Sequence, residues 1–170
     1  PKLAVALTGR SGEALEEYKK LMLKLNNEVV AAAPDDLLIN THVCRGNYHS
    51  TFFSSGAYDS VADLLFGEEN VNAYYLEYDD ERSGGFAPLA KVSGDKKVVL
   101  GLVTTKTPAL ENKELVINRI HEAAKYVPLD RLYLSPQCGF ASCEIGNKLT
   151  EEEQWAKLKL VKEIAEEVWG

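Results

Sequence analysis

The chain has 170 residues, of which 45% are hydrophobic and 26% are charged, proportions typical of a folded domain rather than a disordered segment. Its net charge of −7 disfavours binding to nucleic acid, because the 19 Lys and Arg residues are scattered and form no basic stripe. No apolar run approaches the roughly 20 residues that cross a bilayer, and the N-terminus lacks a signal-peptide pattern. We therefore expect a cytoplasmic protein that binds neither nucleic acid nor membrane.

The cysteine content favours reduced thiols over a disulfide scaffold. Cys44, Cys138 and Cys143 cannot all pair with one another, and three cysteines are few for a disulfide-stabilised domain. Each thiol is therefore a candidate metal ligand or nucleophile. The sequence has no low-complexity segment and no fixed-period repeat, so we predict a single domain over residues 1–170.

The N-terminal half of the chain predicts two helices and one strand. Residues 2–7, KLAVAL, favour either a fifth short strand or an extended entry to the helix that follows. Residues 11–30 carry apolar side chains every three or four positions, the pattern of an amphipathic helix. The apolar run at 37–44, LLINTHVC, predicts a buried strand, and residues 58–67 predict a helix closed by Gly67.

The C-terminal half continues the alternation of strands and helices. Strands are predicted at 72–79, 98–105 and 131–135, and a helix at 114–127 ends before Pro128. A loop, DDERSGGFAPLAKVSGDKK, separates the first two of these strands without a clear long helix. The last helix, at 150–170, opens with Thr150 and has Glu153 three residues on, which is the pattern of a capping box.

This order of elements predicts an α/β fold with a parallel sheet and right-handed crossovers. A closed (β/α)₈ barrel needs about 200 residues or more. With 170 residues and four predicted strands, this chain could supply only about half of one. A small open α/β sheet is the alternative.

Chemically reactive side chains follow the predicted strands. His42 and Cys44 end the first strand, Glu77 the second and Cys138 the fourth, while Lys106 follows the third. The carboxyl ends of parallel strands lie at one edge of a sheet, where functional groups concentrate. Imidazole, thiolate and carboxylate are the donors that tetrahedral zinc prefers, and two thiolates disfavour magnesium and calcium.

Each of these residues also has a structural interpretation. A lone cysteine such as Cys138 is more often a small buried hydrophobe than a ligand. Glu77 lies in an acidic run, and such runs are usually solvated. His49, His121 and Cys143 have no spacing that favours metal binding. The glycine-containing stretches SGG and RGN lack the framework of a phosphate-binding loop.

Four segments together resemble one known family. They are HVC at 42–44, the Glu of YLEYDDERSG at 77, the Cys of LSPQCGFAS at 138, and the C-terminal LTEEEQWAKLKLVKEIAEEVWG. The first three, in this order, resemble the zinc-binding motifs of the cobalamin-independent methionine synthases, and the C-terminal segment looks like the ending of the short single-barrel relatives in bacteria. The resemblance covers nearly the whole chain.

The resemblance implies a TIM-type catalytic barrel in which zinc is held by His42, Cys44, Glu77 and Cys138. It implies that the metal binds the thiol of homocysteine, which accepts the methyl group of a methyltetrahydrofolate to give methionine. Where the longer enzymes have a histidine thought to assist proton transfer, this chain has Lys106. Lys106 is therefore either the catalytic proton donor, if burial or a nearby cation lowers its pKa, or a loop lysine that binds an anionic substrate.

The resemblance also implies that part of the barrel lies outside this chain. In the family, the Asp of a DEP motif holds the substrate amino group, and the chain begins at what looks like the proline of that motif, Pro1. We therefore interpret the chain as a C-terminal half-barrel, inactive alone, that self-associates or pairs with an N-terminal half-barrel. The alternatives are a non-catalytic zinc-binding or assembly module, and a related thiol methyltransferase with a non-folate donor.

Overall fold

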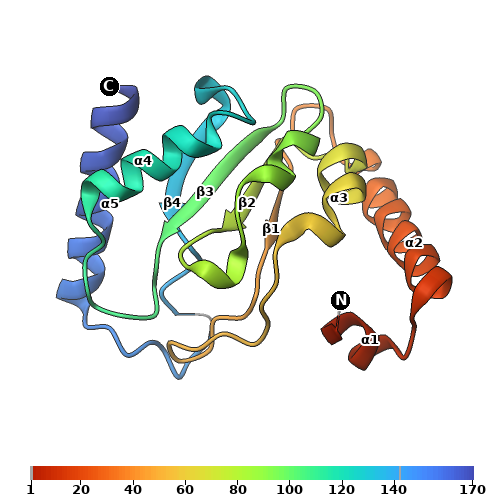
Figure 1. Cartoon of the computed structure of the whole chain (residues 1–170), viewed down its shortest axis with the longest axis horizontal. Coiled ribbons are helices and arrows are strands. Elements are labelled where there is room, and N and C mark those ends of the chain that lie inside the picture. Colours follow the sequence, from red (N-terminus) through yellow and green to blue (C-terminus); the bar gives the residue numbers. More distant parts are fainter. Residues whose placement is uncertain (1, 142) are drawn as a thin grey trace.

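The computed structural model describes residues 2–141 and 143–170 and shows alternating strands and helices (Figure 1). The α-helices are α1 (Lys2–Thr8), α2 (Gly12–Ala31), α3 (Ala62–Glu68), α4 (Lys113–Ala123) and α5 (Glu151–Trp169). The strands are β1 (Asn40–Val43), β2 (Ala73–Glu77), β3 (Lys97–Val103) and β4 (Leu132–Pro136). Short 3₁₀ helices are η1 (Tyr58–Ser60), η2 (Glu81–Ser83), η3 (Ala87–Lys91) and η4 (Leu129–Arg131).

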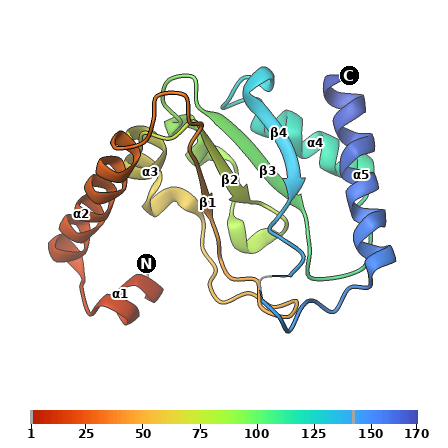
Figure 2. The same cartoon turned by 180° about the vertical axis from the view of Figure 1, so that it is seen from behind.

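The four strands form one parallel sheet in the order β1-β2-β3-β4, so each strand pairs with the next one along the chain. In register, His42 lies opposite Tyr75, which lies opposite Val99, which lies opposite Tyr133. The predicted α/β fold with a parallel sheet is therefore confirmed, and the sheet has half the strands of a (β/α)₈ barrel. All four strands deliver their carboxyl ends to the same edge (Figure 2).

The two faces of the sheet differ in burial because side chains alternate along a strand. One face packs under the helices and carries fully buried residues such as Tyr74, Leu76, Leu100 and Leu132. On the other face Tyr75 and Tyr133 remain 40% and 42% exposed. A hollow of about 710 Å³ lies over this exposed face, lined by residues of all four strands. The exposed face thus resembles the inner surface of a (β/α)₈ barrel of which only four neighbouring strands are present.

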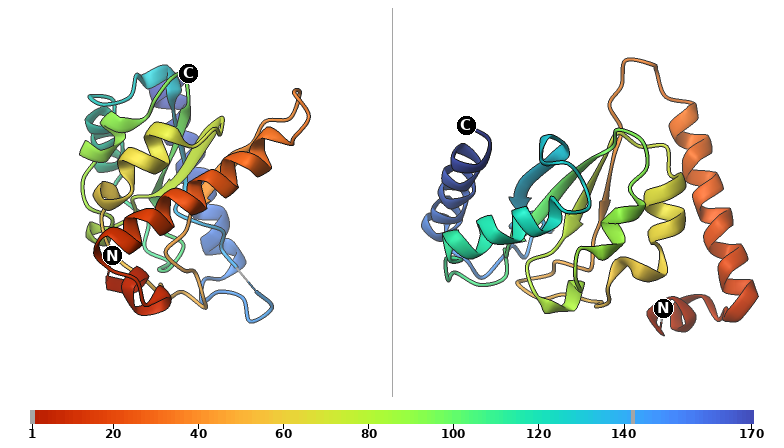
Figure 3. Two further views of the ribbon diagram at one scale, coloured as in Figure 1. Left: turned by 90° about the vertical axis from the view of Figure 1, so that its right-hand side faces the viewer. Right: turned by 45° about the horizontal axis from the view of Figure 1, so that its top comes forward.

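Helices α3 and α4 cover the buried face, and α2 and α5 stand at its two sides (Figure 3). Helix α5 begins with the predicted capping box: the Thr150 side chain accepts from Glu153 N, and Thr150 N donates to Glu153 Oε2. The apolar stripe predicted for α2 is present, yet Leu21, Leu25 and Val29 are exposed and only Leu15 is buried. No helix of residues 2–141 and 143–170 is both long and apolar enough to cross a membrane.

Three local expectations need correction. Residues 2–7 are neither a strand nor an extended entry, because they lie in α1, where Thr8 Oγ1 donates to Ala4 O and Gly9, with φ of +68°, ends the helix. Strand β1 is shorter than the apolar run at 37–44, since no neighbouring strand pairs with residues 37–39. The helix predicted at 58–67 is a 3₁₀ turn followed by α3, which includes Gly67.

The crossover between β2 and β3 is ordered although it lacks a long helix. It carries η2 and η3, and it inserts Phe86 and Leu89 into the core, where they are 2% and 0% exposed. The ring of Phe86 contacts that of Tyr78 with centroids 4.6 Å apart. Two short 3₁₀ helices and two buried side chains therefore replace the covering helix that a regular βαβ unit would have.

A buried ion pair fastens α5 to the loop after β3. The Lys157 side chain is fully buried, and its Nζ donates to Ala109 O at 2.7 Å and to both carboxylate oxygens of Glu111 at 3.0 and 3.1 Å. Glu111 Oε1 also accepts from Thr104 N at 2.8 Å. This contact therefore fixes the chain where it leaves β3.

We predict that Lys157→Met destabilises the protein by about 3 kcal/mol, because it removes the donor of the Ala109 carbonyl and the cation that pairs with the partly buried Glu111 carboxylate, which keeps only Thr104 N among the described residues. The control is Lys159→Met, since Lys159 makes only an exposed pair with Glu163 at 3.8 Å, of the kind worth about 0–1 kcal/mol. Urea unfolding of both variants checks this. Equal losses in the two variants would contradict a special role for the buried pair.

Candidate metal centre

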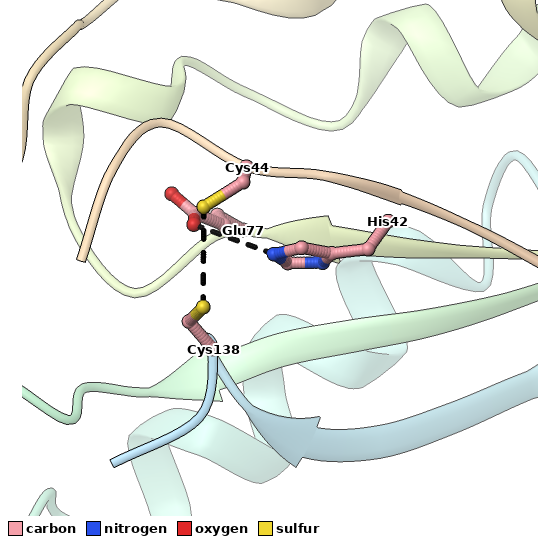
Figure 4. Close-up of side chains that lie close together, drawn as sticks. All are labelled: His42, Cys44, Glu77 and Cys138. Atoms are coloured by element: carbon pink, nitrogen blue, oxygen red, sulfur yellow. Dashed lines mark hydrogen bonds and ion pairs between the residues drawn. The ribbon is translucent and has the colours of Figure 1, made fainter. Parts of the chain in front are cut away.

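The four predicted ligands meet at the carboxyl edge of the sheet. His42 lies in β1 and Cys44 directly after it, Glu77 is the last residue of β2, and Cys138 lies two residues beyond β4. One ligand atom from each of the four lies within 4.8 Å of the others (Figure 4). Three separate strands thus bring two thiols, one imidazole and one carboxylate to a single point.

The spacing of the donor atoms suits a tetrahedral metal. Cys44 Sγ and Cys138 Sγ are 3.9 Å apart, and His42 Nε2 is 3.8 Å from Glu77 Oε1. Zinc–sulfur bonds of about 2.3 Å at tetrahedral angles place two sulfurs roughly 3.8 Å apart. Burial raises the pKa of the Cys44 thiol, although the hydrogen bond from Gly46 N lowers it. A bound cation would oppose this rise by favouring the thiolate.

His42 is oriented by the neighbouring strand. Its Nδ1 lies 3.1 Å from Tyr75 O, a carbonyl that can only accept, so this nitrogen carries the proton. The lone pair of Nε2 is then directed toward Glu77, as a metal ligand requires. A hydrogen bond from the second ring nitrogen to a backbone carbonyl is the usual support of a metal-binding histidine.

Glu77 is the most deeply buried member of the cluster, with a side chain that is 0% exposed. Its Oε1 accepts from Gln137 Nε2 at 3.1 Å, and Gln137 Oε1 accepts from Thr105 Oγ1 at 2.9 Å. Its Oε2 has no hydrogen-bond partner among the described residues, and the nearest cation is Arg82 Nη2 at 3.8 Å. A buried carboxylate oxygen without a donor is costly, and a metal ion would supply the missing partner.

The backbone at Cys44 and Glu77 is held by Arg45, which is buried. Its guanidinium donates to Gly56 O, to Tyr58 Oη at 2.7 Å and to Glu77 O at 3.2 Å, and it stacks on the Tyr58 ring. Tyr58 Oη in turn accepts from Glu77 N at 2.9 Å. Arg45 therefore joins the loop that carries Cys44 to the end of β2 that carries Glu77.

Lys106 lies beside this cluster and is not one of the four donors. It follows β3, its side chain is 8% exposed, and its Nζ is 3.9 Å from Asp79 Oδ2. Burial lowers its pKa, while the Asp79 carboxylate opposes this by raising it. Lys106, Asp79 and Arg82 line a hollow of about 490 Å³, and a second hollow of about 310 Å³ borders His42 and Cys138.

Other sequence candidates lie outside the cluster. His49, His121 and Cys143 are not among its donors. The interpretation of the acidic run as a solvated face is wrong for Glu77 and Asp79, whose side chains are both 0% exposed. The supporting residues Arg45, Gln137, Asp79 and Arg82 had no sequence signal beyond lying next to, or shortly after, a predicted ligand.

The chain is similar in sequence to several known proteins. Residues 15–167 match the family model described as "Cobalamin-independent synthase, Catalytic domain". The protein YxjG of Bacillus subtilis (strain 168) is 54% identical over 159 residues, which are 93% of this chain and 42% of YxjG. The 5-methyltetrahydropteroyltriglutamate–homocysteine methyltransferase of Bacillus licheniformis is 25% identical over 157 residues, covering 91% of this chain and 18% of that protein.

A solved structure from Listeria monocytogenes, assigned to the vitamin-B12-independent methionine synthases, has a TM-score of 0.72 and 41% identity. The match covers 95% of this chain and 43% of the Listeria chain. This chain therefore spans less than half the length of these relatives, and its sheet corresponds to part of their barrel.

We predict that the chain binds about one zinc ion at this centre and that Cys44→Ser or Cys138→Ser loses most of it, because a serine hydroxyl is a poor replacement for a thiolate. Cys143→Ser is the matched control and should keep the metal. Metal analysis after dialysis against a weak chelator, with circular dichroism to verify folding, measures this. Retention of zinc in both ligand variants would rule out the assignment.

Proposed function

The chain belongs to the family of cobalamin-independent synthase catalytic domains, and from this premise we propose that residues 1–170 form the zinc-binding half of a barrel that methylates the thiol of homocysteine to give methionine. The observation that carries the proposal is the cluster of two thiols, one imidazole and one carboxylate within 4.8 Å of one another. Two soft sulfur donors with nitrogen and oxygen select zinc over magnesium or calcium.

A zinc ion held by His42, Cys44, Glu77 and Cys138 would keep the substrate thiol deprotonated near neutral pH and so supply the nucleophile. The sulfur attacks the methyl carbon of a methyltetrahydrofolate. A carbon–sulfur bond forms, the carbon–nitrogen bond breaks, and its electron pair stays on the donor nitrogen. Lys106, as an ammonium group, gives that nitrogen a proton and regains one from solvent.

If zinc were held by these four residues, Glu77 would be the donor most easily displaced by a substrate sulfur, because thiolates hold zinc more strongly than a carboxylate does. Gln137 Nε2 at 3.1 Å and Arg82 Nη2 at 3.8 Å already face its two oxygens. A Glu77 carboxylate released from the metal would thus stay buried and still have the Gln137 amide and the Arg82 guanidinium beside it. His42 and Cys44 are exposed, so that the substrate can approach from their side.

The open face of the sheet supports a second part of the proposal, pairing with another half-barrel. Strands β1 and β4 are edge strands, and the hollow of about 710 Å³ over the open face is lined in part by Leu38, Tyr75 and Tyr133. Leu38 is 75% exposed. Open edges and exposed apolar surface of this kind favour association.

A non-catalytic zinc centre is the second candidate, favoured by the full set of four protein donors. Structural zinc sites are closed by four protein ligands, whereas catalytic sites keep or exchange a position for the substrate. The two candidates differ in whether an added thiol enters the metal's ligand shell.

We predict that homocysteine adds a sulfur ligand to the zinc-loaded protein. Zinc X-ray absorption with and without homocysteine measures this, and homoserine, which has a hydroxyl in place of the thiol, is the control. An unchanged ligand shell at saturating homocysteine would favour the structural centre and overturn the catalytic proposal.

We predict that the chain alone self-associates through its open face, because burying that face removes apolar surface from water. Sedimentation equilibrium should give a mass above that of one chain. Leu38→Lys should reduce association, whereas Leu115→Lys is the control, since Leu115 is 63% exposed but lies on α4, which covers the opposite face of the sheet. A monomeric wild-type chain, or equal effects of both substitutions, would contradict this part of the proposal.

A further inference from the structure

Three charged side chains beside the metal cluster are buried without being ligands. Asp79 lies two residues after Glu77, Arg82 lies in η2 and Lys106 follows β3. Their side chains are 0%, 7% and 8% exposed. Burial of three charges is costly unless they are paired, so their contacts indicate what each one does.

The three form a row in which Asp79 occupies the middle. Arg82 Nη2 donates to Asp79 Oδ1 at 2.8 Å, and the same guanidinium also pairs with Asp80. The second oxygen of Asp79 faces Lys106 Nζ at 3.9 Å. Neither Asp79 Oδ2 nor Lys106 Nζ has a hydrogen-bond partner among the described residues. Arg82 therefore fixes one oxygen of Asp79 and leaves the other toward Lys106.

The backbone of Lys106 is fixed independently of Asp79. Lys106 N donates to Thr104 Oγ1 at 3.3 Å, and Thr105 Oγ1 donates to Gln137 Oε1 at 2.9 Å. Thr104 N is held by Glu111, which pairs with the buried Lys157. The base of the Lys106 side chain is therefore rigid, and the charge at its tip depends on what surrounds Nζ.

The charged and titratable groups that face Lys106 come from two strand ends. Asp79 and Arg82 follow β2, Glu77 ends β2, and Cys138 follows β4. Burial and Arg82 lower the pKa of Lys106, whereas Asp79, Glu77 and Cys138 raise it, and Asp79 has the largest effect of these three. Once Glu77 and Cys138 bind a cation, their negative charge is offset. Asp79 is then the main group that keeps Lys106 charged.

We propose that Asp79, fixed by Arg82, is a positioning residue that holds Lys106 as an ammonium group at the wall of the hollow of about 490 Å³ beside the metal centre. This inference rests on the proposed function, because it concerns the residue assigned there as proton donor. Asp79 itself touches no reacting atom. Its role is to keep the proton of Lys106 in place until a leaving nitrogen in the hollow accepts it.

The experiment is an NMR titration of Lys106 in the zinc-loaded chain, with its side-chain resonance assigned by its loss in Lys106→Gln. In Asp79→Asn we expect the pKa of Lys106 to fall by about one unit, a tenfold loss of proton affinity. Asp79→Glu, which keeps the carboxylate, should restore most of it. An unchanged Lys106 pKa in Asp79→Asn would overturn the inference.

Asp80→Asn is the matched control, because Asp80 also pairs with Arg82 but its side chain is 46% exposed. It should leave the Lys106 titration unchanged, and an equal shift in this variant would contradict a specific role for Asp79. Zinc content is measured for every variant and should stay at the wild-type level. Failure of the wild-type chain to bind zinc would sink the proposed function, whereas the same titration of the metal-free chain would still decide whether Asp79 controls Lys106.

Discussion

Burying a carboxylate costs free energy unless hydrogen bonds or nearby charges compensate it, and Glu77 places a buried carboxylate at the carboxyl edge of the sheet. Its side chain is fully buried, and the described residues give it one hydrogen bond from Gln137 and a more distant cation, Arg82. A cation bound between Glu77 and the neighbouring thiols would supply the remaining compensation.

Backbone pairing and then side-chain hydrogen bonds set the positions of the residues around Glu77. Parallel pairing brings the ends of β1, β2 and β4 to one edge, and a guanidinium, Arg45, joins the first two of these ends through Tyr58 and the carbonyl of Glu77. Gln137 holds the carboxylate from the β4 side. His42 and Glu77 are thus each positioned by a group on a neighbouring strand or loop, which is how metal sites generally set ligand orientation.

Most elements of the fold follow from local patterns, and most of the supporting contacts do not. The period of apolar residues predicts the four strands and the later helices, and the capping box of α5 can be read directly from Thr150 and Glu153. The helix at residues 2–8 was missed because KLAVAL suits a strand as well as a helix, so the choice depends on whether a neighbouring strand is available. The start of β1 likewise depends on where a neighbouring strand begins to pair, which the apolar run at 37–44 does not show.

In the site, too, residues marked by a local sequence pattern can be predicted, whereas contacts between residues far apart along the chain cannot. The sequence identifies the four candidate ligands because each lies at or just after the end of a predicted strand and together they resemble one family's motifs. Their binding of zinc stays a prediction. Burial of Asp79 was missed, because an acidic run gives no indication that a distant lysine, Lys106, packs against it. Arg45 was missed because its partners lie up to 32 residues away along the chain.

The cluster is exposed on one side only, and under the proposed function this bears on how the complete catalyst is assembled. Glu77, Asp79 and Lys106 are buried by this chain alone, whereas His42 and Cys44 face the open side of the sheet. This chain therefore supplies the charges of the centre but does not exclude water from its outer side. Electrostatic effects on a reacting thiol strengthen when water is excluded. Under the proposed function, a second half-barrel that covers the open face would thus complete the centre by removing solvent, even where it adds no ligand.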